Sequence, residues 1–385
     1  MPCTTTFPTP SLIDKGSDSL MTTRRQFIAQ TAAVTAAPFI STRVTRALAA
    51  ASEKRLGFAL CGLGNLSTHQ IAPGLQKTAN CRLAGIITGT PEKAVKWKAQ
   101  YGIPDKNIYN YDTMHRIADN RDIDVVYVVT PNALHLDYAL IAAKAGKHVL
   151  CEKPMEVSVA RCQQMIDAVK AANRLLAIGY RCRFEPNHLE CIRIAHSKEF
   201  GELKVIDGYF GFEVPVGVWR TNRALSGGGP LMDVGIYALQ TTRYLTGEEP
   251  LWVSASTTKG DPERFSEVEA SVLWQAGFPS GAVSYCGASF NAAPTGYFRA
   301  IADRGWFGLE PAYNYDGLHG MRSDGTPIAL PAIDVFAAEM DDFARCIRDK
   351  SPSLVPGEEG LRDVKIMMSI YESARTGKPV DLRAA

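Results

Sequence analysis

Short apolar runs alternate with amphipathic segments through the first half of the chain. Runs of four to seven mostly apolar residues predict buried strands, and apolar positions three or four residues apart in the intervening segments predict helices. This alternation is typical of a doubly wound parallel sheet with helices on both faces, which we expect over residues 54–179. The predicted strands are Leu56–Cys61, Arg82–Ile87, Ile123–Val129, Lys147–Cys151 and Leu175–Ile178, and the predicted helices include Pro91–Ala99, Asp112–Ala118 and Val157–Ala172.

The pattern changes after Gly179. A helical segment is followed by strand candidates with few helices between the later ones, which indicates a largely antiparallel sheet. We therefore expect a second domain over residues 180–385, an open, mainly antiparallel sheet flanked by helices, so that the fold class is α/β followed by α+β. The expected helices are Pro186–His196, Phe336–Arg348 and Gly360–Thr376, and the expected strands are Leu203–Phe212, Leu251–Thr257, Val268–Trp274, Gly281–Cys286, Tyr297–Asp303 and Trp306–Leu309.

The first 49 residues have the pattern of a targeting segment. The arginine pair in Thr22–Ile28 is typical of a twin-arginine export signal, an apolar stretch follows it, and Ala47-Leu48-Ala49 fits an A-x-A cleavage site. We expect residues 1–49 to be removed, with a mature start near residue 50 and a periplasmic location. Met21 lies directly before the signal, so translation could start at Met1 or at Met21.

Composition narrows the classes of partner. Among 385 residues, 46% are hydrophobic and 21% charged, as in ordinary globular proteins. The whole chain has a formal net charge of +2, of which residues 1–49 contribute +3, so the rest of the chain has a net charge of −1. That remainder contains no run of basic residues. This argues against nucleic acid or an anionic membrane as partner. The nine cysteines form no Cys-x-x-Cys pair, so no metal site is expected.

A glycine-rich turn follows the first predicted strand. In Gly62-Leu63-Gly64-Asn65-Leu66-Ser67, the first glycine permits a tight turn, the second lets the backbone approach a pyrophosphate, and Ser67 supplies the small third residue. The start of the following helix offers free N–H groups to a phosphate. The segment predicts a dinucleotide site.

The end of the second strand bears on which dinucleotide binds. An NAD site usually has an acidic residue here, which accepts hydrogen bonds from the ribose 2′-hydroxyl. This chain has Thr88-Gly89-Thr90-Pro91-Glu92-Lys93 instead. A hydroxyl, backbone N–H groups and a lysine suit a 2′-phosphate, so we expect NADP.

Two further strands end with polar residues at the same edge of the predicted sheet. Thr130-Pro131-Asn132 follows the predicted strand Ile123–Val129, and Glu152-Lys153-Pro154 follows the predicted strand Lys147–Cys151. His135, which begins the next predicted helix, is a further candidate for contact with the cofactor. Ligands of open α/β sheets bind beyond the carboxyl ends of the strands. Pro154 holds Lys153 extended, so the chain leaves the sheet directly after the lysine.

A helix in the second half pairs an acid with a phenol. Gly227-Gly228-Gly229-Pro230 forms a turn with proline at the expected first helical position. Asp233 and Tyr237 are four residues apart, so they share one helix face. Such a pair beside a glycine turn is a candidate substrate site.

Together these motifs resemble the glucose–fructose oxidoreductase / inositol dehydrogenase / rhizopine catabolism (Gfo/Idh/MocA) family, and most of all its exported glucose–fructose branch, from about residue 56 to the C-terminus. The resemblance also uses Gly179-Tyr180-Arg181, Trp219-Arg220, Arg243–Pro250 and Pro356–Gly360. It implies a Rossmann domain and an antiparallel sheet domain with the nicotinamide between them. It implies catalysis by Lys153, Tyr237 and Asp233, sugar contacts by these three and Arg181, and cofactor contacts by Gly62, Gly64, Asn65, Leu66, Thr88, Gly89, Lys93, Tyr111, Thr130, Asn132, His135, Glu152, Lys153, Arg181, Trp219 and Arg220.

The chemistry that the resemblance implies is oxidation of an aldose at C1 and reduction of a second sugar. A free tyrosine, with a pKa near 10, is a poor base at neutral pH, and a nearby Lys153 ammonium would stabilise the Tyr237 phenolate. Because the periplasm has no dependable NADP pool, an exported enzyme must carry its cofactor bound and reoxidise it in place. This predicts a ping-pong cycle that yields an aldonic acid and an alditol.

Two departures from the family pattern matter. Many relatives have histidine where this chain has Tyr237, although the glucose–fructose branch has tyrosine. That branch also has a proline-rich N-terminal arm that braces a tetramer, and only a few residues separate Ala49 from Leu56 here. We therefore expect a homodimer.

Three alternatives remain at this point. An exported redox-assisted glycoside hydrolase with tightly held NAD shares the fold, but its motif helix usually differs from Asp233-x-x-x-Tyr237. A conventional dehydrogenase with exchangeable NADP is disfavoured by the export signal. A non-catalytic sugar or NADP(H) sensor needs no proton-transfer pair, and this chain keeps Lys153, Asp233 and Tyr237 together.

Overall fold

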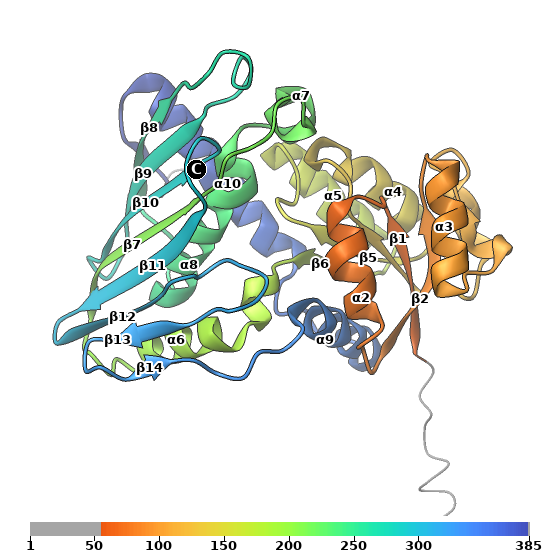
Figure 1. Cartoon of the computed structure of the whole chain (residues 1–385), viewed down its shortest axis with the longest axis horizontal. Coiled ribbons are helices and arrows are strands. Elements are labelled where there is room, and N and C mark those ends of the chain that lie inside the picture. The colour runs from red at the N-terminus through yellow and green to blue at the C-terminus, as the bar shows by residue number, and fades with distance from the viewer. Residues whose placement is uncertain (1–54, 384–385) are drawn as a thin grey trace, which may run out of the picture. The chain divides into compact units, whose positions relative to one another are not determined.

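The structure, a computed structural model, describes residues 55–383. The predicted signal and its cleavage site lie outside these residues. From residue 55 onward, two sheets belong to one compact unit: a six-stranded parallel sheet and a nine-stranded, mainly antiparallel sheet (Figure 1). The predicted fold class is confirmed.

The parallel sheet has the strand order β3-β2-β1-β4-β5-β6. The chain direction across the sheet reverses between β1 and β4, and ligands bind at such a switch point in doubly wound sheets. Its central strands are apolar because both faces are covered; every residue of β4 is buried. The strands are β1 (Leu56–Cys61), β2 (Cys81–Ile87), β3 (Ile108–Tyr109), β4 (Val125–Val128), β5 (His148–Glu152) and β6 (Leu176–Gly179).

Four α-helices connect these strands: α2 (Ala72–Leu75), α3 (Pro91–Tyr101), α4 (His135–Lys144) and α5 (Val159–Ala171). Three predicted helices differ in type. The segment after Gly62 begins with a π-helical turn, Ser67–Ile71, and the helix expected after Pro230 also begins with one, Leu231–Gly235. The segment predicted as Asp112–Ala118 is a 3₁₀-helix, Met114–Asp119. Spacing of apolar residues cannot separate these helix types, because they differ by less than one residue per turn.

The second sheet has the order β14-β13-β12-β11-β7-β10-β9-β8-β15, and only β7 and β10 pair in parallel among its strands. The short elements α7, β13, β14 and β15 were not predicted. The strands are β7 (Leu203–Gly211), β8 (Trp252–Thr258), β9 (Ser271–Gly277), β10 (Val283–Ser289), β11 (Thr295–Ala302), β12 (Gly305–Leu309), β13 (Gly320–Arg322), β14 (Pro327–Ile328) and β15 (Val380–Asp381).

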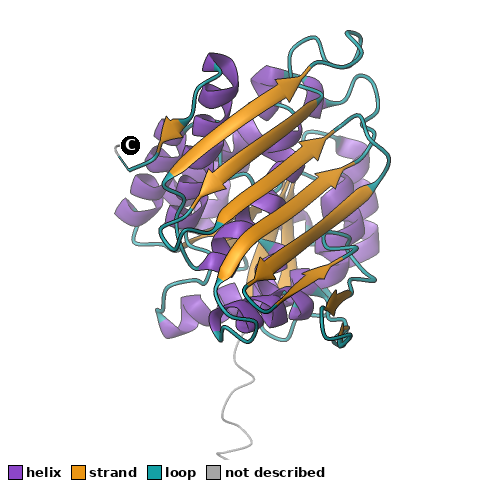
Figure 2. Cartoon of the chain, turned by 90° about the vertical axis from the view of Figure 1, so that its left-hand side faces the viewer, coloured by secondary structure: helices purple, strands orange, loops and turns teal. Residues whose placement is uncertain are grey.

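Helices cover one face of this sheet, and the strands of the other face are open to view in Figure 2. Helix α8 is buried along nearly its whole length against β7, β10 and α10. Its Arg243 forms ion pairs with Asp363 (2.6 Å) and Glu359 (2.9 Å) of α10. The helices of this half are α6 (Pro186–His196), α7 (Arg223–Ser226), α8 (Ile236–Thr246), α9 (Val335–Asp349) and α10 (Gly357–Thr376).

The last two helices also contact the parallel-sheet half. Helix α10 packs against α5, and α9 packs against α2 and β2. The carboxylate of Asp341 on α9 accepts backbone hydrogen bonds from Ala79 (2.8 Å) and Asn80 (2.7 Å). These contacts hold the two sheets together around one cleft. Within residues 55–383, no helix combines the length and apolar character that crossing a bilayer requires.

Candidate active site

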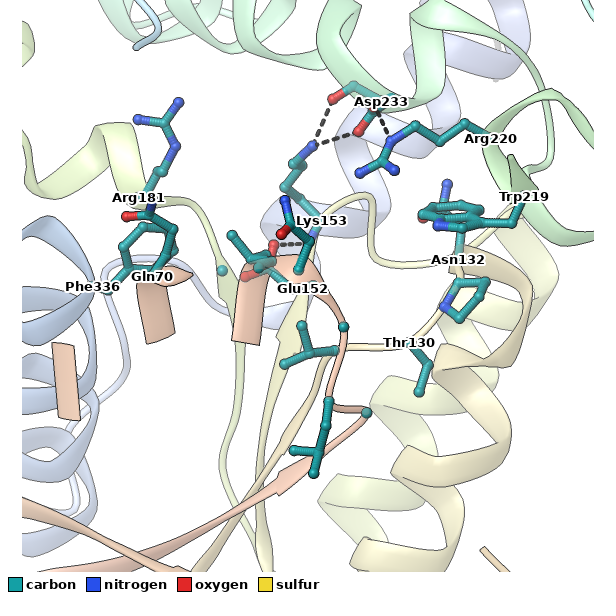
Figure 3. A pocket seen from close by; sticks show the side chains of 18 of the residues that line it. Gln70, Thr130, Asn132, Glu152, Lys153, Arg181, Trp219, Arg220, Asp233 and Phe336 are labelled. Atoms are coloured by element: carbon teal, nitrogen blue, oxygen red, sulfur yellow. Dashed lines mark hydrogen bonds and ion pairs between the residues drawn. The ribbon is translucent and has the colours of Figure 1, made fainter. Parts of the chain in front are cut away.

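A cleft of about 990 Å³ lies where the carboxyl ends of β1, β4 and β5 meet the second half of the chain. Figure 3 shows side chains from both halves pointing into it. Of the site residues predicted from the sequence, those that line this cleft are Gly62, Gly64, Asn65, Leu66, Thr88, Gly89, Lys93, Tyr111, Thr130, Asn132, Glu152, Lys153, Arg181, Trp219, Arg220, Asp233 and Tyr237.

The glycine turn after β1 forms one wall. Gly62 has a φ of +97°, and a Cβ there would lie 2.4 Å from the Val129 carbonyl oxygen, so a side chain does not fit. Gly64 has open space where its Cβ would be. The hydroxyl of Ser67 donates to the Gly62 carbonyl oxygen at 2.6 Å and fixes the turn. The backbone is therefore shaped for close approach by a ligand such as a pyrophosphate.

The end of β2 forms the adjoining wall. The ammonium of Lys93, on α3, donates to the Leu63 carbonyl oxygen at 3.0 Å, which brings its charge to the edge of the glycine turn. Gly89 leaves space for the ring of Tyr111, which stacks on Tyr138 with centroids 4.8 Å apart. The described lining at this end offers the Thr88 hydroxyl and the Lys93 ammonium and no carboxylate.

Lys153 and Asp233 join the two halves across the cleft. The Lys153 ammonium donates to the Asp233 carbonyl oxygen at 2.6 Å and to its Oδ1 at 3.2 Å. The guanidinium of Arg220 donates to Asp233 Oδ2 at 2.8 Å (Figure 3). Burial acts to raise the pKa of Asp233, but Arg220 and Lys153 outweigh it and lower that pKa to about 2. Asp233 is therefore an ionised carboxylate held between two cations.

The lysine is charged as well. Burial acts to lower the pKa of Lys153, but Tyr237, Asp233 and Glu152 outweigh that effect and raise it above the ordinary value. The Lys153–Pro154 peptide bond is cis. Lys153 lines the cleft with about an eighth of its side chain exposed.

Tyr237 lies between two cations. Arg181 Nε donates to the Tyr237 hydroxyl at 3.2 Å, and the Lys153 ammonium lies 4.8 Å from the centre of its ring. Arg181 is held in turn by the carbonyl oxygens of Tyr313 and Asn314. The sequence predicted that Lys153 lies near the Tyr237 phenol, and the structure shows in addition that Arg181 contacts the phenol oxygen. This arrangement suits a hydroxyl that gives up and regains a proton.

Asn132 and His135 follow β4, and the structure places them differently. Asn132 lines the cleft and donates to the Ser226 carbonyl oxygen at 2.9 Å, next to the glycine turn before Asp233. His135 is fully buried outside the cleft lining. Its ring nitrogens lie 3.0 Å and 2.9 Å from the carbonyl oxygens of Pro154 and Thr130. The expectation that His135 contacts the cofactor is therefore corrected: the ring supports the loops that carry Thr130 and Lys153.

Several residues of the cleft were not anticipated. Arg181 lies over the ring of Tyr315, 4.7 Å from its centre, and Tyr315 lies in the loop after β12, which no motif marks. Phe210 packs edge-on against Tyr237. Alternation along β7 was a signal for Phe210, but nothing in the sequence indicated the loop. The unanticipated lining residues include Gln70, Phe210, Phe212, Tyr313, Asn314, Tyr315, Asp316 and Phe336.

The other reactive side chains lie away from this chemistry. The eight cysteines within residues 55–383 are buried free thiols. In the same residues, no group of three or more His, Cys, Asp or Glu side chains is arranged to hold a metal ion. The candidate chemistry therefore rests on Lys153, Asp233, Tyr237 and Arg181.

Comparison with known proteins places the chain among sugar oxidoreductases. Residues 56–180 match the Gfo/Idh/MocA model described as an oxidoreductase family with an NAD-binding Rossmann fold, and residues 188–308 match the Gfo/Idh/MocA C-terminal domain. D-xylose 1-dehydrogenase [NADP(+)] of Haloarcula marismortui is 30% identical over 86% of this chain and 94% of its own length.

Solved structures extend the comparison. Aldose-aldose oxidoreductase from Caulobacter crescentus, complexed with glycerol, is 41% identical, with a TM-score of 0.83 over 86% of this chain and 100% of that one. A levoglucosan dehydrogenase complexed with NADH and L-sorbose shares the fold at 23% identity, with a TM-score of 0.75 over 85% of this chain and 98% of that one.

Proposed function

The chain belongs to the Gfo/Idh/MocA oxidoreductase family, and from this premise we propose that it is an NADP-dependent aldose–aldose oxidoreductase. It oxidises one aldose at C1 to a lactone, which hydrolyses to the aldonic acid, and reduces a second sugar to an alditol. The observation that carries the proposal is the constellation of Lys153, Asp233, Tyr237 and Arg181 in one cleft with the glycine turn. The likeness to the Caulobacter crescentus aldose-aldose oxidoreductase supports the choice of substrate class.

The residues of the cleft fit NADP. The open space at Gly64 would accept the pyrophosphate, and Thr88 and Lys93 would hold a 2′-phosphate. When bound, the nicotinamide supplies the redox chemistry, taking a hydride from C1 of one sugar and returning it to the carbonyl of another. Glu152 and Lys153, at the carboxyl end of β5, line the same cleft and would help to hold the cofactor.

Tyr237 is the proton-transfer residue of this proposal. As a phenolate, its oxygen takes the proton of the anomeric hydroxyl during oxidation, and as the resulting phenol it returns that proton to the carbonyl oxygen during reduction. The Arg181 guanidinium, 3.2 Å from the Tyr237 oxygen, and the Lys153 ammonium attract the negative charge that develops there. An open-chain sugar is the expected acceptor, because a ring hemiacetal offers no carbonyl.

Asp233 has a second role beside the sugar contact that the resemblance implies. Both of its carboxylate oxygens already accept hydrogen bonds, Oδ1 from Lys153 and Oδ2 from Arg220. Each oxygen keeps a further lone pair for a sugar hydroxyl. Its first effect is to hold the Lys153 ammonium in place, and contact with the sugar comes in addition.

We further propose that the enzyme works in the periplasm with its cofactor retained, and that the two half-reactions form a ping-pong cycle. The twin-arginine motif around Arg24 and Arg25 supports this, since that route carries folded proteins. A retained cofactor must be reoxidised by the second sugar before the next turnover.

A homodimer is the proposed assembly. One face of the large sheet is open (Figure 2). Large apolar side chains on its strands are about half exposed, among them Leu273 on β9 and Tyr285 on β10. A face of this kind is suited to pairing with a second copy of the same chain. No nucleic acid or membrane partner is proposed.

One incubation tests the proposed reaction. Desalted mature protein is mixed with glucose or xylose without added cofactor, and aldonic acid and alditol are both assayed. We expect equal amounts of the two products. A conventional NADP-dependent dehydrogenase is the second candidate, favoured by the likeness to D-xylose 1-dehydrogenase [NADP(+)]. It would give neither product until NADP is added, and then aldonic acid alone.

A further inference from the structure

Three buried side chains connect helix α9 to the strand that carries Lys153. Tyr127 lies on β4, Glu152 ends β5, and Glu339 comes from α9 in the C-terminal part of the chain. Their exposures are 0%, 6% and 1%. The Tyr127 hydroxyl lies 2.7 Å from Glu152 Oε1 and 3.2 Å from Glu339 Oε2. On the far side, Glu152 Oε2 accepts the backbone N–H of Lys153 at 3.3 Å.

The hydroxyl of Tyr127 has one proton for two carboxyl groups. It donates to Glu152, the nearer acceptor at 2.7 Å, and so presents only lone pairs to Glu339 Oε2. An ionised carboxylate has no proton to donate and would meet those lone pairs with repulsion. A protonated carboxyl group at Glu339 instead donates to the Tyr127 oxygen. The 3.2 Å distance between the Tyr127 oxygen and Glu339 Oε2 is a hydrogen bond only when Glu339 carries the proton.

A second observation leads to the same protonation state. Glu339 Oε1 is buried with no hydrogen-bond partner among the described residues. Leaving an oxygen of an ionised carboxylate unpartnered in the interior costs far more than leaving the carbonyl oxygen of a neutral acid. The neutral form therefore fits both oxygens of the side chain.

The surrounding groups agree with this assignment. Burial raises the pKa of Glu339 well above its ordinary range, Glu152 raises it further, Tyr127 and Arg181 lower it, and Cys182 raises it. Burial also raises the pKa of Glu152, against lowering contributions from Tyr127, Lys153 and Arg181. Glu152 is the carboxyl group closer to the cations of the cleft, so it is the one that stays ionised.

We propose that Glu339 is a neutral carboxylic acid that donates to Tyr127, which donates in turn to an ionised Glu152. The chain of hydrogen bonds limits the pair of carboxyl groups to one negative charge beside Lys153. Glu339 does not line the cleft, so it is a positioning residue that acts through Tyr127 and Glu152. Its effect on the reaction rests on the proposed function, because a second negative charge there would oppose the loss of positive charge when the nicotinamide is reduced.

Gly179, which ends β6, leaves space for the hydrogen bond between Tyr127 and Glu152. A Cβ at Gly179 would lie 3.0 Å from Glu152 Oε1 and 3.1 Å from the Tyr127 hydroxyl oxygen. A side chain there would therefore press on the hydrogen bond between Tyr127 and Glu152. Gly179 and Glu152 both line the cleft, so these hydrogen bonds begin at the cleft wall.

Infrared spectroscopy tests the protonation state without any turnover. The difference spectrum between wild type and Glu339→Gln at neutral pH should show the loss of one carbonyl band of a protonated carboxylic acid. Glu190→Gln is the control, because Arg193 lowers the pKa of the partly exposed Glu190 and that side chain is ionised. Loss of carboxylate bands in Glu339→Gln, as in the control, would overturn the proposal.

A second pair of variants tests the positioning role. Glutamine keeps an N–H donor for the Tyr127 oxygen, whereas Glu339→Met fills a similar volume without a donor. We expect the turnover of Glu339→Gln to exceed that of Glu339→Met by about tenfold, the usual effect of losing a hydrogen bond that supports a charged group. Equal turnover of the two folded variants would show that Glu339 only fills space. Because the infrared result does not depend on activity, a failure of the proposed function would leave it intact.

Discussion

The ammonium of Lys153 donates to both the backbone carbonyl oxygen and the Oδ1 of Asp233, at 2.6 Å and 3.2 Å. The two residues are 80 positions apart, one at the end of β5 and the other in the π-helical turn (Leu231–Gly235) that leads into α8. A contact with the backbone fixes the lysine relative to the helix itself. The Tyr237 that follows on α8 is therefore placed relative to the parallel sheet by a partly buried ion pair.

This ion pair should make stability depend on pH in acid. The pKa of Asp233 is about 2 in the folded protein and about 3.9 in an unfolded chain. Its contribution to stability is therefore complete above pH ~4 and is lost as the pH falls through about 2. We expect Asp233→Asn to lower the free energy of unfolding by on the order of 2 kcal/mol at pH 7.

Urea unfolding of wild type and Asp233→Asn at a series of pH values measures this dependence. The difference in unfolding free energy between the two proteins should be constant from pH 7 to pH 5 and shrink below about pH 4. Asp261→Asn, which removes a carboxylate from an exposed side chain, is the control. A difference that persists unchanged at pH 3 would mean that the Asp233 charge is not its source.

Replacing Tyr237 with phenylalanine removes one oxygen and leaves the ring that packs against Phe210. We expect Tyr237→Phe to lower the turnover of both half-reactions by about 10²-fold or more, because the proton-transfer group is lost, while bound NADP is retained. Stopped-flow absorbance of the bound cofactor follows each half-reaction separately. Tyr101→Phe, on α3 outside the cleft lining, is the matched control. Near-wild-type turnover of Tyr237→Phe would rule out its role.

Much of this site could be predicted because its residues lie at the ends of regular elements. Gly62, Thr130 and Lys153 each follow an apolar strand, and parallel strands bring their carboxyl ends to one edge. Asp233 and Tyr237 share a helix face by spacing alone. The predicted strands of both sheets were found for the same reason, since alternation and apolar runs are local properties.

Other features depend on contacts that the sequence does not encode locally. Tyr315 reaches the cleft because the chain after β12 returns to Arg181, and no periodicity marks such a loop. Glu339 reads as an ordinary polar residue of an amphipathic helix, and only the docking of α9 brings it to Tyr127. For His135 the sequence correctly predicted a position beside the site. It did not indicate that the ring contacts the backbone of the two neighbouring loops.

Lys93 should determine the preference for NADP. Its ammonium lies at the edge of the glycine turn, 3.0 Å from the Leu63 carbonyl oxygen, where a 2′-phosphate would gain a charge-assisted hydrogen bond. We expect Lys93→Ala to weaken NADP binding by about tenfold or more and to leave NAD binding nearly unchanged. Titration of cofactor-free protein by intrinsic fluorescence measures both affinities. Lys96→Ala, on the same helix but outside the cleft lining, is the control. Equal weakening of NAD and NADP would show that Lys93 acts on the glycine turn instead.

The open face of the large sheet should mediate the proposed homodimer. Leu273 is 54% exposed and Tyr285 is 49% exposed on neighbouring antiparallel strands, β9 and β10, and such apolar exposure is rarely left facing water. We expect Leu273→Glu to convert a dimer to a monomer, because two like charges would be buried when the same face of each copy meets. Light scattering coupled to size-exclusion chromatography gives the mass directly. Val95→Glu changes an apolar residue on α3 that is 70% exposed, away from this sheet, and should leave the mass unchanged. A Leu273→Glu protein that stays dimeric would place the interface elsewhere, and a wild type of monomer mass would contradict the dimer itself.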